Sequence, residues 1–430
     1  YPLYFGNNAI TGSFSDKLVT ASSEESASFP RFESDNKVLK INNIGEGVKY
    51  EGGFRLHGRT LYGYGSKDSK AKLEIANLQK ERVFYGESLL FTIRREERIS
   101  GNKVDGALYF GKDSIYHPSI DLRYDIKSRQ LQLTRGQSAT DRNPFFDSYH
   151  KVNIDSENIV AYMDSDSIVI GKRTISISNK GDVVFESMEF FKKSEYFRIQ
   201  NLSDNNPIAI MKVTAEREGS NFIDANLLAS RINPKFTVEN IQSLLYDLVS
   251  KGFVNYDSDK QLVEVKDKVF HYANADQGKV DYDVLAVKSL TDNTNAVLNT
   301  RNGYMMVDGV ENIELSSKQR VGLKPLGKQV VMRKNRNIDM DGRVFAGFSI
   351  LEGRDIHFEY DKFQLRSDSI RFFDLYVPTG QLDKKQEPIA QSIASRIEHL
   401  KGVLLIDAPS NKSSREDIEM FPSLQSKELS

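Results

Sequence analysis

The closest approach to a metal-binding motif is the segment that runs from Asn337 through Asp339 and Asp341 to Gly342. It matches the start of an EF-hand loop, in which oxygen atoms of alternate residues bind Ca²⁺. The glutamate that should close such a loop is replaced by Phe348, and strand-like sequence stands where helices should flank it. The three oxygen-bearing residues are therefore a weak calcium candidate, and the pattern favours an Asp-Gly turn between two strands.

The sequence contains no recognisable motif for other catalytic chemistry. None of the histidines stands at a metal-binding spacing from another, and the chain has no cysteine, no H-E-x-x-H, no phosphate loop and no G-x-S-x-G. No catalytic residue and no cofactor is predicted. The six histidines are His57, His117, His150, His271, His357 and His399.

Paired carboxylates are frequent, for example Asp355 with Glu359 and Asp164 with Asp166, but 60 acidic residues produce such pairs by chance. A β-helical glycosidase or lyase would need its catalytic groups to converge in a cleft, which spacing alone does not reveal. An enzyme acting on carbohydrate therefore stays an alternative.

The tripeptide Asp-Ser-Ile occurs three times, with its serine at Ser114, Ser167 and Ser369, each time where a strand is expected to begin. An Asp or Ser that bonds its own backbone turns the chain, and the β-branched residue then starts the strand. The tripeptide also resembles the O-glycosylation sequon of exported Bacteroidota proteins. That resemblance implies glycans on the three serines.

Composition narrows the classes of partner. Lys and Arg (59) balance Asp and Glu (60) and are interspersed, so the chain has no basic footprint for nucleic acid. Apolar residues make up 39%, with 25 Phe and 19 Tyr, which is enough for a large core. No apolar run approaches the roughly 20 residues of a membrane-spanning helix, so no membrane span is expected in this segment.

Alternating apolar and polar residues recur from Lys37 onward and predict half-buried strands. Two stretches resemble each other: 120–125 followed by 129–131, and 356–361 followed by 363–365. In each, a strand ends in Tyr-Asp, a turn follows and a second strand starts. Such rungs predict a mainly β fold, either a β-solenoid or a stack of curved antiparallel sheets, with convergent hairpin chemistry as the alternative.

One region has helical periodicity, from Asn221 to about Gly252, and two short strand-like runs follow it. This order predicts an inserted winged-helix-like α+β module. The second helix carries Glu239 and Asp247, and the tip of the wing carries Asp257 and Asp259. Such charges oppose phosphate contacts, so the module is expected to pack or to contact protein instead of DNA.

A further amphipathic helix is predicted over 388–401, with Ile389, Ile393, Ile397 and Leu400 on one face and Gly402 as the stop, covering the edge of a sheet. The expected organisation has four parts: a Ser-rich segment at 1–36, a strand-repeat region at 37–215, the winged-helix-like insert at 216–280, and a second strand-repeat region at 281–430. The uncapped ends suggest an internal fragment of a larger protein.

Several phrases resemble a family of very large, strand-rich, functionally uncharacterised exported proteins of Bacteroidota. They are Phe29-Pro30-Arg31-Phe32 leading into the stretch 47–54, then the stretch 403–413, then Phe421-Pro422-Ser423-Leu424. The resemblance implies a cell-envelope protein in the periplasm or at the outer membrane and supplies no site residues. The stretch 120–133 is also similar to repeats of the lipopolysaccharide-transport β-jellyroll proteins.

These observations favour a non-catalytic cell-envelope scaffold or protein-interaction element whose partners are envelope proteins. The jellyroll resemblance implies an alternative, a β-groove that binds lipid or acyl chains. A β-helical carbohydrate-active enzyme is the second alternative. A continuous apolar channel would favour the groove, and a filled core would oppose it.

Overall fold

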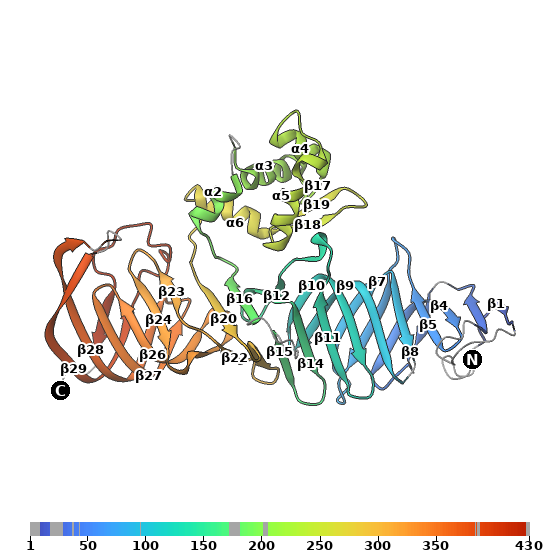
Figure 1. The fold of residues 1–430 in the computed structure, drawn as a ribbon, viewed down its shortest axis with the longest axis horizontal. Helices are drawn as coiled ribbons and strands as arrows, with labels where there is room; N and C mark the ends of the chain where they lie inside the picture. The colour runs from blue at the N-terminus through green and yellow to red at the C-terminus, as the bar shows by residue number, and fades with distance from the viewer. Residues whose placement is uncertain are drawn as a thin grey trace.

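The computed structural model describes residues 9–17, 29–36, 38–42, 44–94, 96–171, 181–200, 205–382, 384 and 388–426. In this part the fold is mainly β, as the sequence predicts, and antiparallel strands follow one another along the long axis of the molecule (Figure 1). A helical module rises from the middle of the strand array.

The strands before the module are β1 (Gly12–Ser15), β2 (Arg31–Ser34), β3 (Leu39–Ile41), β4 (Val48–His57), β5 (Thr60–Tyr64), β6 (Ala71–Ala76), β7 (Arg82–Ser88), β8 (Leu90–Arg94), β9 (Arg98–Phe110), β10 (Asp113–Asp125), β11 (Gln130–Arg135), β12 (Phe145–Asp147), β13 (Val152–Asp155), β14 (Asn158–Tyr162), β15 (Ser167–Ile170) and β16 (Gly181–Ser187). A 3₁₀ turn, η2 (Ala139–Asp141), lies between β11 and β12.

The module contains α2 (Lys193–Gln200), α3 (Pro207–Glu218), β17 (Phe222–Asp224), α4 (Ala225–Ile232), α5 (Val238–Ser250), β18 (Val254–Asp257), β19 (Leu262–Val265) and α6 (Asp267–Asp276). The strands after it are β20 (Ala286–Thr291), β21 (Ala296–Asn299), β22 (Met305–Asp308), β23 (Ile313–Ser316), β24 (Val321–Pro325), β25 (Gln329–Met332), β26 (Ile338–Ala346), β27 (Ser349–Glu359), β28 (Gln364–Leu382), β29 (Pro388–Leu405) and β30 (Ser423–Ser426), with 3₁₀ turns η3 (Leu326–Lys328) and η4 (Lys334–Arg336).

The strands form two layers, because each long strand pairs with different neighbours along its two halves. In β9, residues near 98–101 pair with β8, whereas residues 105–108 pair with β7. The layer nearer the module then continues through β12, β13, β16 and β20. The opposite layer continues through β11, β14, β15, β21 and β22. Beyond the module, β26 joins both layers again through β24 and β25.

The long strands bend where they cross from one layer to the other. In β26 the pairing with β27 shifts between Met340 and Gly342. A Cβ at Gly342 would lie 2.4 Å from the Lys324 carbonyl oxygen, so the close approach of the backbones requires glycine there. The expected Asp-Gly turn at Asp341 is therefore wrong, because these residues form a bulge inside a continuous strand.

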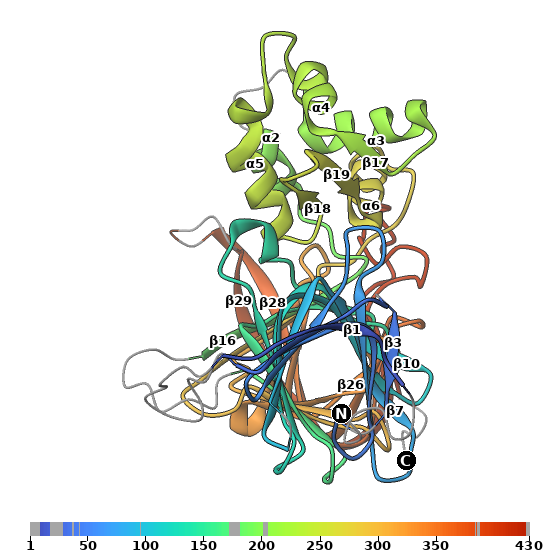
Figure 2. The ribbon, with the colours of Figure 1, turned by 90° about the vertical axis from the view of Figure 1, so that its right-hand side faces the viewer.

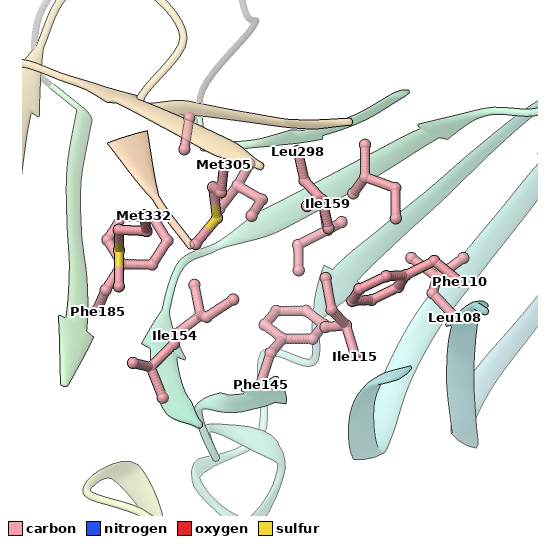
Figure 3. Close-up of a cluster of buried hydrophobic side chains, with 14 of the residues drawn as sticks. Leu108, Phe110, Ile115, Phe145, Ile154, Ile159, Phe185, Leu298, Met305 and Met332 are labelled. Atoms are coloured by element: carbon pink, nitrogen blue, oxygen red, sulfur yellow. The ribbon is translucent and has the colours of Figure 1, made fainter. Parts of the chain in front are cut away.

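The inward-facing residues of both layers make one core from the first strands to the last. Phe54, Phe84 and Phe91 are completely buried near one end, and Phe358 and Ile406 near the other. Figure 3 shows the middle of this core, where Phe145 and Ile154 of one layer face Ile159 and Leu298 of the other. Alternating burial along the strands follows from the two-residue period of a strand.

The module is inserted between two paired strands. β16 and β20 are antiparallel neighbours, and the Ser187 amide donates to the Leu285 carbonyl at 3.0 Å. The chain between them folds around a second core of its own, which includes Leu245, Phe253 and Tyr272. Figures 1 and 2 show it standing clear of the layers on one side.

The helical part starts earlier than expected. All of α2 and most of α3 precede residue 216, in the segment assigned to strand repeats. Asn206 caps α3 by accepting from the Ile208 amide at 2.9 Å, directly before Pro207. This cap with a following proline is a start signal that the sequence carries.

The predicted helix at 388–401 is wrong. These residues form most of β29, which pairs with β28 over its length. Ile389, Ile393 and Ile397 lie on an exposed face, with 41%, 48% and 38% of their surface accessible. A spacing of four residues repeats on one face of a strand as well as of a helix, and β-branched isoleucine suits a strand.

The two resembling stretches form equivalent hairpins, β10–β11 and β27–β28. Arg129 and Phe363, at matching positions, both have a φ of 49°. Their carbonyls accept from the amides of Met163 and Ile406, which directly follow the neighbouring strands β14 and β29, each at 3.1 Å. The residues before the turns match too, because Tyr124 and Tyr360 are both buried.

The Ser-rich segment at 1–36 lies partly outside the described residues. Its described part forms β1 and β2, which pair with each other between Gly12 and Ser34. The segment therefore contributes strands at the N-terminal end of the array.

Candidate functional site

The calcium candidates lie at the outer face of β26. Asp339 accepts hydrogen bonds from the Nδ1 of His357 and the Nε of Arg333, one on each carboxylate oxygen. Burial raises the pKa of Asp339, but the hydrogen bond from His357 and the positive charge of Arg333 outweigh it and hold the pKa below its usual value. Within the described ranges no three acidic or histidine side chains are arranged to hold a metal ion, so calcium binding stays a prediction.

The other two calcium candidates are also engaged. Asn337 Oδ1 accepts from the Tyr360 amide at 2.8 Å, and Asp341 Oδ1 accepts from the Asp355 amide at 2.8 Å. These contacts fasten β26 to β27 and to the turn after it.

The serines of the Asp-Ser-Ile tripeptides are at or near the surface. Ser114 and Ser167 are half-buried at the start of β10 and β15, where the tripeptide was expected to begin a strand. Ser369 is exposed but lies inside β28, so the expected strand start is wrong for the third copy. Glycosylation of the three serines stays a prediction.

His150 and Asp147 form a buried pair at the end of β12. The His150 Nδ1 lies 2.7 Å from Asp147 Oδ2, and its Nε2 lies 2.9 Å from the Gly303 carbonyl oxygen. Both ring nitrogens are thus bonded to acceptors, and both side chains are fully buried. The pair ties β12 to the turn before β22.

A polar cluster fixes the base of the module, and we call Arg336, Asp283, Tyr360, Ser187 and Glu189 the base cluster. Tyr360 donates to Asp283 at 2.5 Å, and the Arg336 guanidinium lies 3.7 Å from the centre of the Tyr360 ring. Arg336 also lies 3.3 Å from Glu189 and 3.8 Å from Asp283. Burial raises the pKa of Asp283, opposed by the hydrogen bonds from Ser187 and Tyr360 and by the Arg336 charge.

A second attachment lies beside the wing, the hairpin of β18 and β19. The Asn143 side chain donates to the carbonyls of Val249 and Val254, at 3.2 and 2.9 Å. His117 holds Asn143 in turn, since its Nε2 lies 2.8 Å from the Asn143 carbonyl and its Nδ1 accepts from the Ser119 amide. Burial lowers the pKa of His117 to about 3, so the ring is neutral at physiological pH.

Between this attachment and the free end of the wing lies a cleft of about 800 Å³, which we call the wing cleft. One wall is the outer face of the module's small sheet, with Phe222 from β17, Asn255 from β18 and Glu264 from β19. The other wall comes from the two layers of strands outside the module, which we call the stack, and it includes the β7–β8 turn at Leu89 and Asp105 of β9.

The floor of the wing cleft brings carboxyl groups of the two walls together. Burial raises the pKa of Asp105, and Lys70 opposes that rise. The Tyr116 hydroxyl bonds Asp105, and the negative charge of Glu264 raises the pKa of Asp105 further. Glu264 also accepts from Asn255 at 2.7 Å. Burial lowers the pKa of Lys266, against the attraction of these two carboxylates.

The lining of the wing cleft is acidic, with five carboxylates against three lysines. It also has exposed apolar side chains on both walls: Leu89 at 47%, Leu90 at 46% and Phe222 at 55%. A cleft of this kind can bind a cation beside an apolar group. The sequence does not reveal it because its walls come from two separate segments, 70–143 and 222–264, although the acidic wing tip at Asp257 and Asp259 is visible in the sequence.

No protein-family model matches the chain, and neither a curated protein nor a solved structure matches it with significance. Within the described residues, no helix combines the length and the apolar character needed to cross a bilayer.

Proposed function

We propose that this chain is a non-catalytic scaffold of the cell envelope, outside the cytoplasm, that holds its helical module for contact with another envelope protein. The proposal rests on one observation above the others: a single filled core runs through the two layers and carries a separately cored insert at its middle.

The filled core favours a scaffold over a lipid groove. Phe54, Phe84 and Phe91 are completely buried, and so are Leu298 and Met332 further along. The side chains that line a conduit wide enough for an acyl chain would be exposed to the conduit. The interior between the layers is instead occupied by side chains.

The way in which the module is attached favours an interaction role. Binding residues are concentrated on insertions that a rigid framework positions. Here the insert replaces a hairpin turn, and the base cluster, Asn143 and the 412–415 loop, which bonds Asp281 and Ala275, hold it in place. A partner would therefore meet the module in a defined orientation.

We further propose that the strands are rungs of a solenoid-like array and that the module is winged-helix-like. Support for the rungs comes from the β10–β11 and β27–β28 hairpins, which share a left-handed residue, an inward tyrosine and the same bond to the next strand. Support for the wing comes from the order α4, α5, β18 and β19.

The test compares the full chain with a module-excised chain, in which an Asn-Gly turn replaces residues 188–284. Since excision removes Asp283 and Glu189, the variant also carries Arg336→Met, which avoids a buried unpaired cation. Both chains are cross-linked in cells of the native host, and the cross-linked proteins are identified by mass spectrometry after fractionation.

We expect specific envelope proteins to cross-link to the full chain through residues of the module. Cross-links to these proteins should be absent for the module-excised chain. An identical set of cross-linked proteins for the two chains would contradict the interaction role. Recovery of the full chain in the cytoplasmic fraction would contradict the proposed location.

A further inference from the structure

We propose that the wing cleft binds an extended segment of a partner protein that carries a lysine or arginine next to an apolar side chain. This inference rests on the proposed function and names the site and the chemistry through which the partner would be held.

The first argument is the convergence of carboxylates from two parts with separate cores. Asp105 comes from β9 of the stack and Glu264 from β19 of the module, and both line the wing cleft together with Tyr116. Burial raises the pKa of Tyr116, and the charges of both carboxylates raise it further. Like charges brought together in a partly buried place repel each other. The cationic group of an entering lysine or arginine would relieve that repulsion and could donate hydrogen bonds to both carboxylates.

The charged groups around these carboxylates do not fully neutralise their negative charge. Lys70 and Lys266 face Asp105, but Glu87 faces it as well, and Lys266 is half-buried with a lowered pKa. At the mouth, Lys260 lies 3.9 Å from Asp257 and is thus partly neutralised within the wing. The cleft as a whole remains acidic, whereas the chain as a whole is nearly neutral.

The second argument is the apolar surface on both walls. Leu89 and Leu90 stand at the β7–β8 turn, and Phe222 stands opposite them on β17. Large apolar side chains that face one another across an open cleft, rimmed by polar residues, are typical of a binding surface. An apolar residue beside the basic one would fill the space between these walls.

The walls are held at a fixed separation, which suits a peptide more than a large globular surface. Asn143 joins them at the back through its bonds to Val249 and Val254. Pro144 packs against Gly252 at the same place. The opening that remains, about 800 Å³, fits a few extended residues.

The experiment measures binding of three fluorescent synthetic peptides to the purified full chain by anisotropy. In the first peptide Lys alternates with Leu, in the second Glu replaces Lys, and in the third Ser replaces Leu. We expect the Lys-Leu peptide to bind at least about tenfold more tightly than either of the others, with an affinity that falls as salt rises.

Two variants locate the binding. The double variant Asp105→Asn with Glu264→Gln should weaken binding of the Lys-Leu peptide by about tenfold or more. The double variant Phe222→Ser with Leu90→Ser should weaken it by as much. The matched controls are Glu218→Gln and Leu78→Ser, at exposed residues outside the cleft, and they should leave the affinity unchanged. Unchanged melting temperatures establish that each variant is folded.

Equal binding of the Lys-Leu and Glu-Leu peptides, or equal affinity for the cleft and control variants, would overturn the assignment. Displacement of the Lys-Leu peptide by a purified oligosaccharide would also overturn it, in favour of a sugar site. The two proposals can fail separately. If partners cross-link through the module but the cleft variants bind the Lys-Leu peptide normally, the cleft proposal alone is contradicted. If the same partners are retained after module excision, the interaction role is contradicted.

Discussion

The stack and the module follow two different packing rules in one chain. In the stack, every second residue of a strand faces the shared core, as in the alternating burial of β11. In α5, by contrast, Ile241, Leu245 and Leu248 are buried at spacings of four and three residues. The contrast teaches that burial at an odd spacing identifies a helix, since residues three apart fall on opposite faces of a strand, as the exposed Ile397 and the buried Leu400 do in β29.

The two cores should respond separately to truncation. Phe84→Ala in the stack and Phe253→Ala in the module should each lower the free energy of unfolding of their own region by about 3–5 kcal/mol, because both rings are completely buried. Hydrogen exchange measured segment by segment should show faster exchange in the mutated region.

Leu78→Ala serves as the control, since Leu78 is 55% exposed and its loss should change exchange little. If Phe253→Ala accelerated exchange in β4 to β9 as much as in α5, the cores would form one cooperative unit and the comparison would fail.

The base cluster should contribute most of the coupling between the two regions. Arg336→Met leaves Asp283 buried without its cation, which should cost about 3 kcal/mol of stability in chemical denaturation. Adding Asp283→Asn removes the uncompensated charge and should restore part of that loss.

The matched control is Arg343→Met. Arg343 pairs with Glu352 at 2.7 Å but its side chain is 52% exposed, so the change should cost less than about 1 kcal/mol. Equal losses of stability for Arg336→Met and Arg343→Met would show that burial of the base cluster does not increase its contribution to stability.

Acid should loosen the attachment at Asn143. The pKa of His117 is about 3 in the folded chain, below the ordinary value of about 6.5, so the unfolded chain binds the proton more strongly. The contribution of His117 to stability is therefore complete above pH 6.5. It is lost as the pH falls from there toward 3, by up to about 1.4 kcal/mol per pH unit.

Denaturation at several pH values, with the His117→Gln variant as reference, measures this slope. The variant should lose stability less steeply on acidification than the wild-type chain. Parallel curves for the two proteins would show that His117 is protonated without cost in the folded state.

The smallest effect on stability is expected on β29, where the sequence predicted a helix. Ile393→Ser on β29 should change stability by no more than about 0.5 kcal/mol, since the side chain is 48% exposed. Ile241→Ser on α5, where the side chain is 2% exposed, should cost several times more. A large loss at Ile393 would indicate that its face is covered.

Local patterns predicted much of the fold. The alternation around Leu73 and Leu108 predicts β6 and β9, and the odd spacings around Leu245 predict α5. The Tyr-Asp turns at Tyr124 and Tyr360 identified two hairpins that prove equivalent in backbone geometry. In each of these cases the determining residues are neighbours in the chain.

The failures have physical reasons of their own. At 388–401 the three isoleucines are four residues apart and fit a strand as well as a helix, whereas Leu400, three residues after Ile397, favoured the helix; pairing with β28 makes the segment a strand. At Asp341 a bulge inside β26 took the place of a turn, because long strands bend between layers. The wing cleft could not be predicted, since Asp105 and Glu264 meet only through tertiary packing.

The most direct test of the account is the thermal unfolding of the module-excised chain, followed by circular dichroism and calorimetry. Because β16 and β20 are already paired at Ser187 and Leu285, a short turn between them should leave the stack intact. We predict a strand-rich spectrum and a cooperative transition within a few degrees of that of the full chain. Aggregation, or loss of the cooperative transition, would contradict the claim that the stack is a filled scaffold that carries the module as an insert.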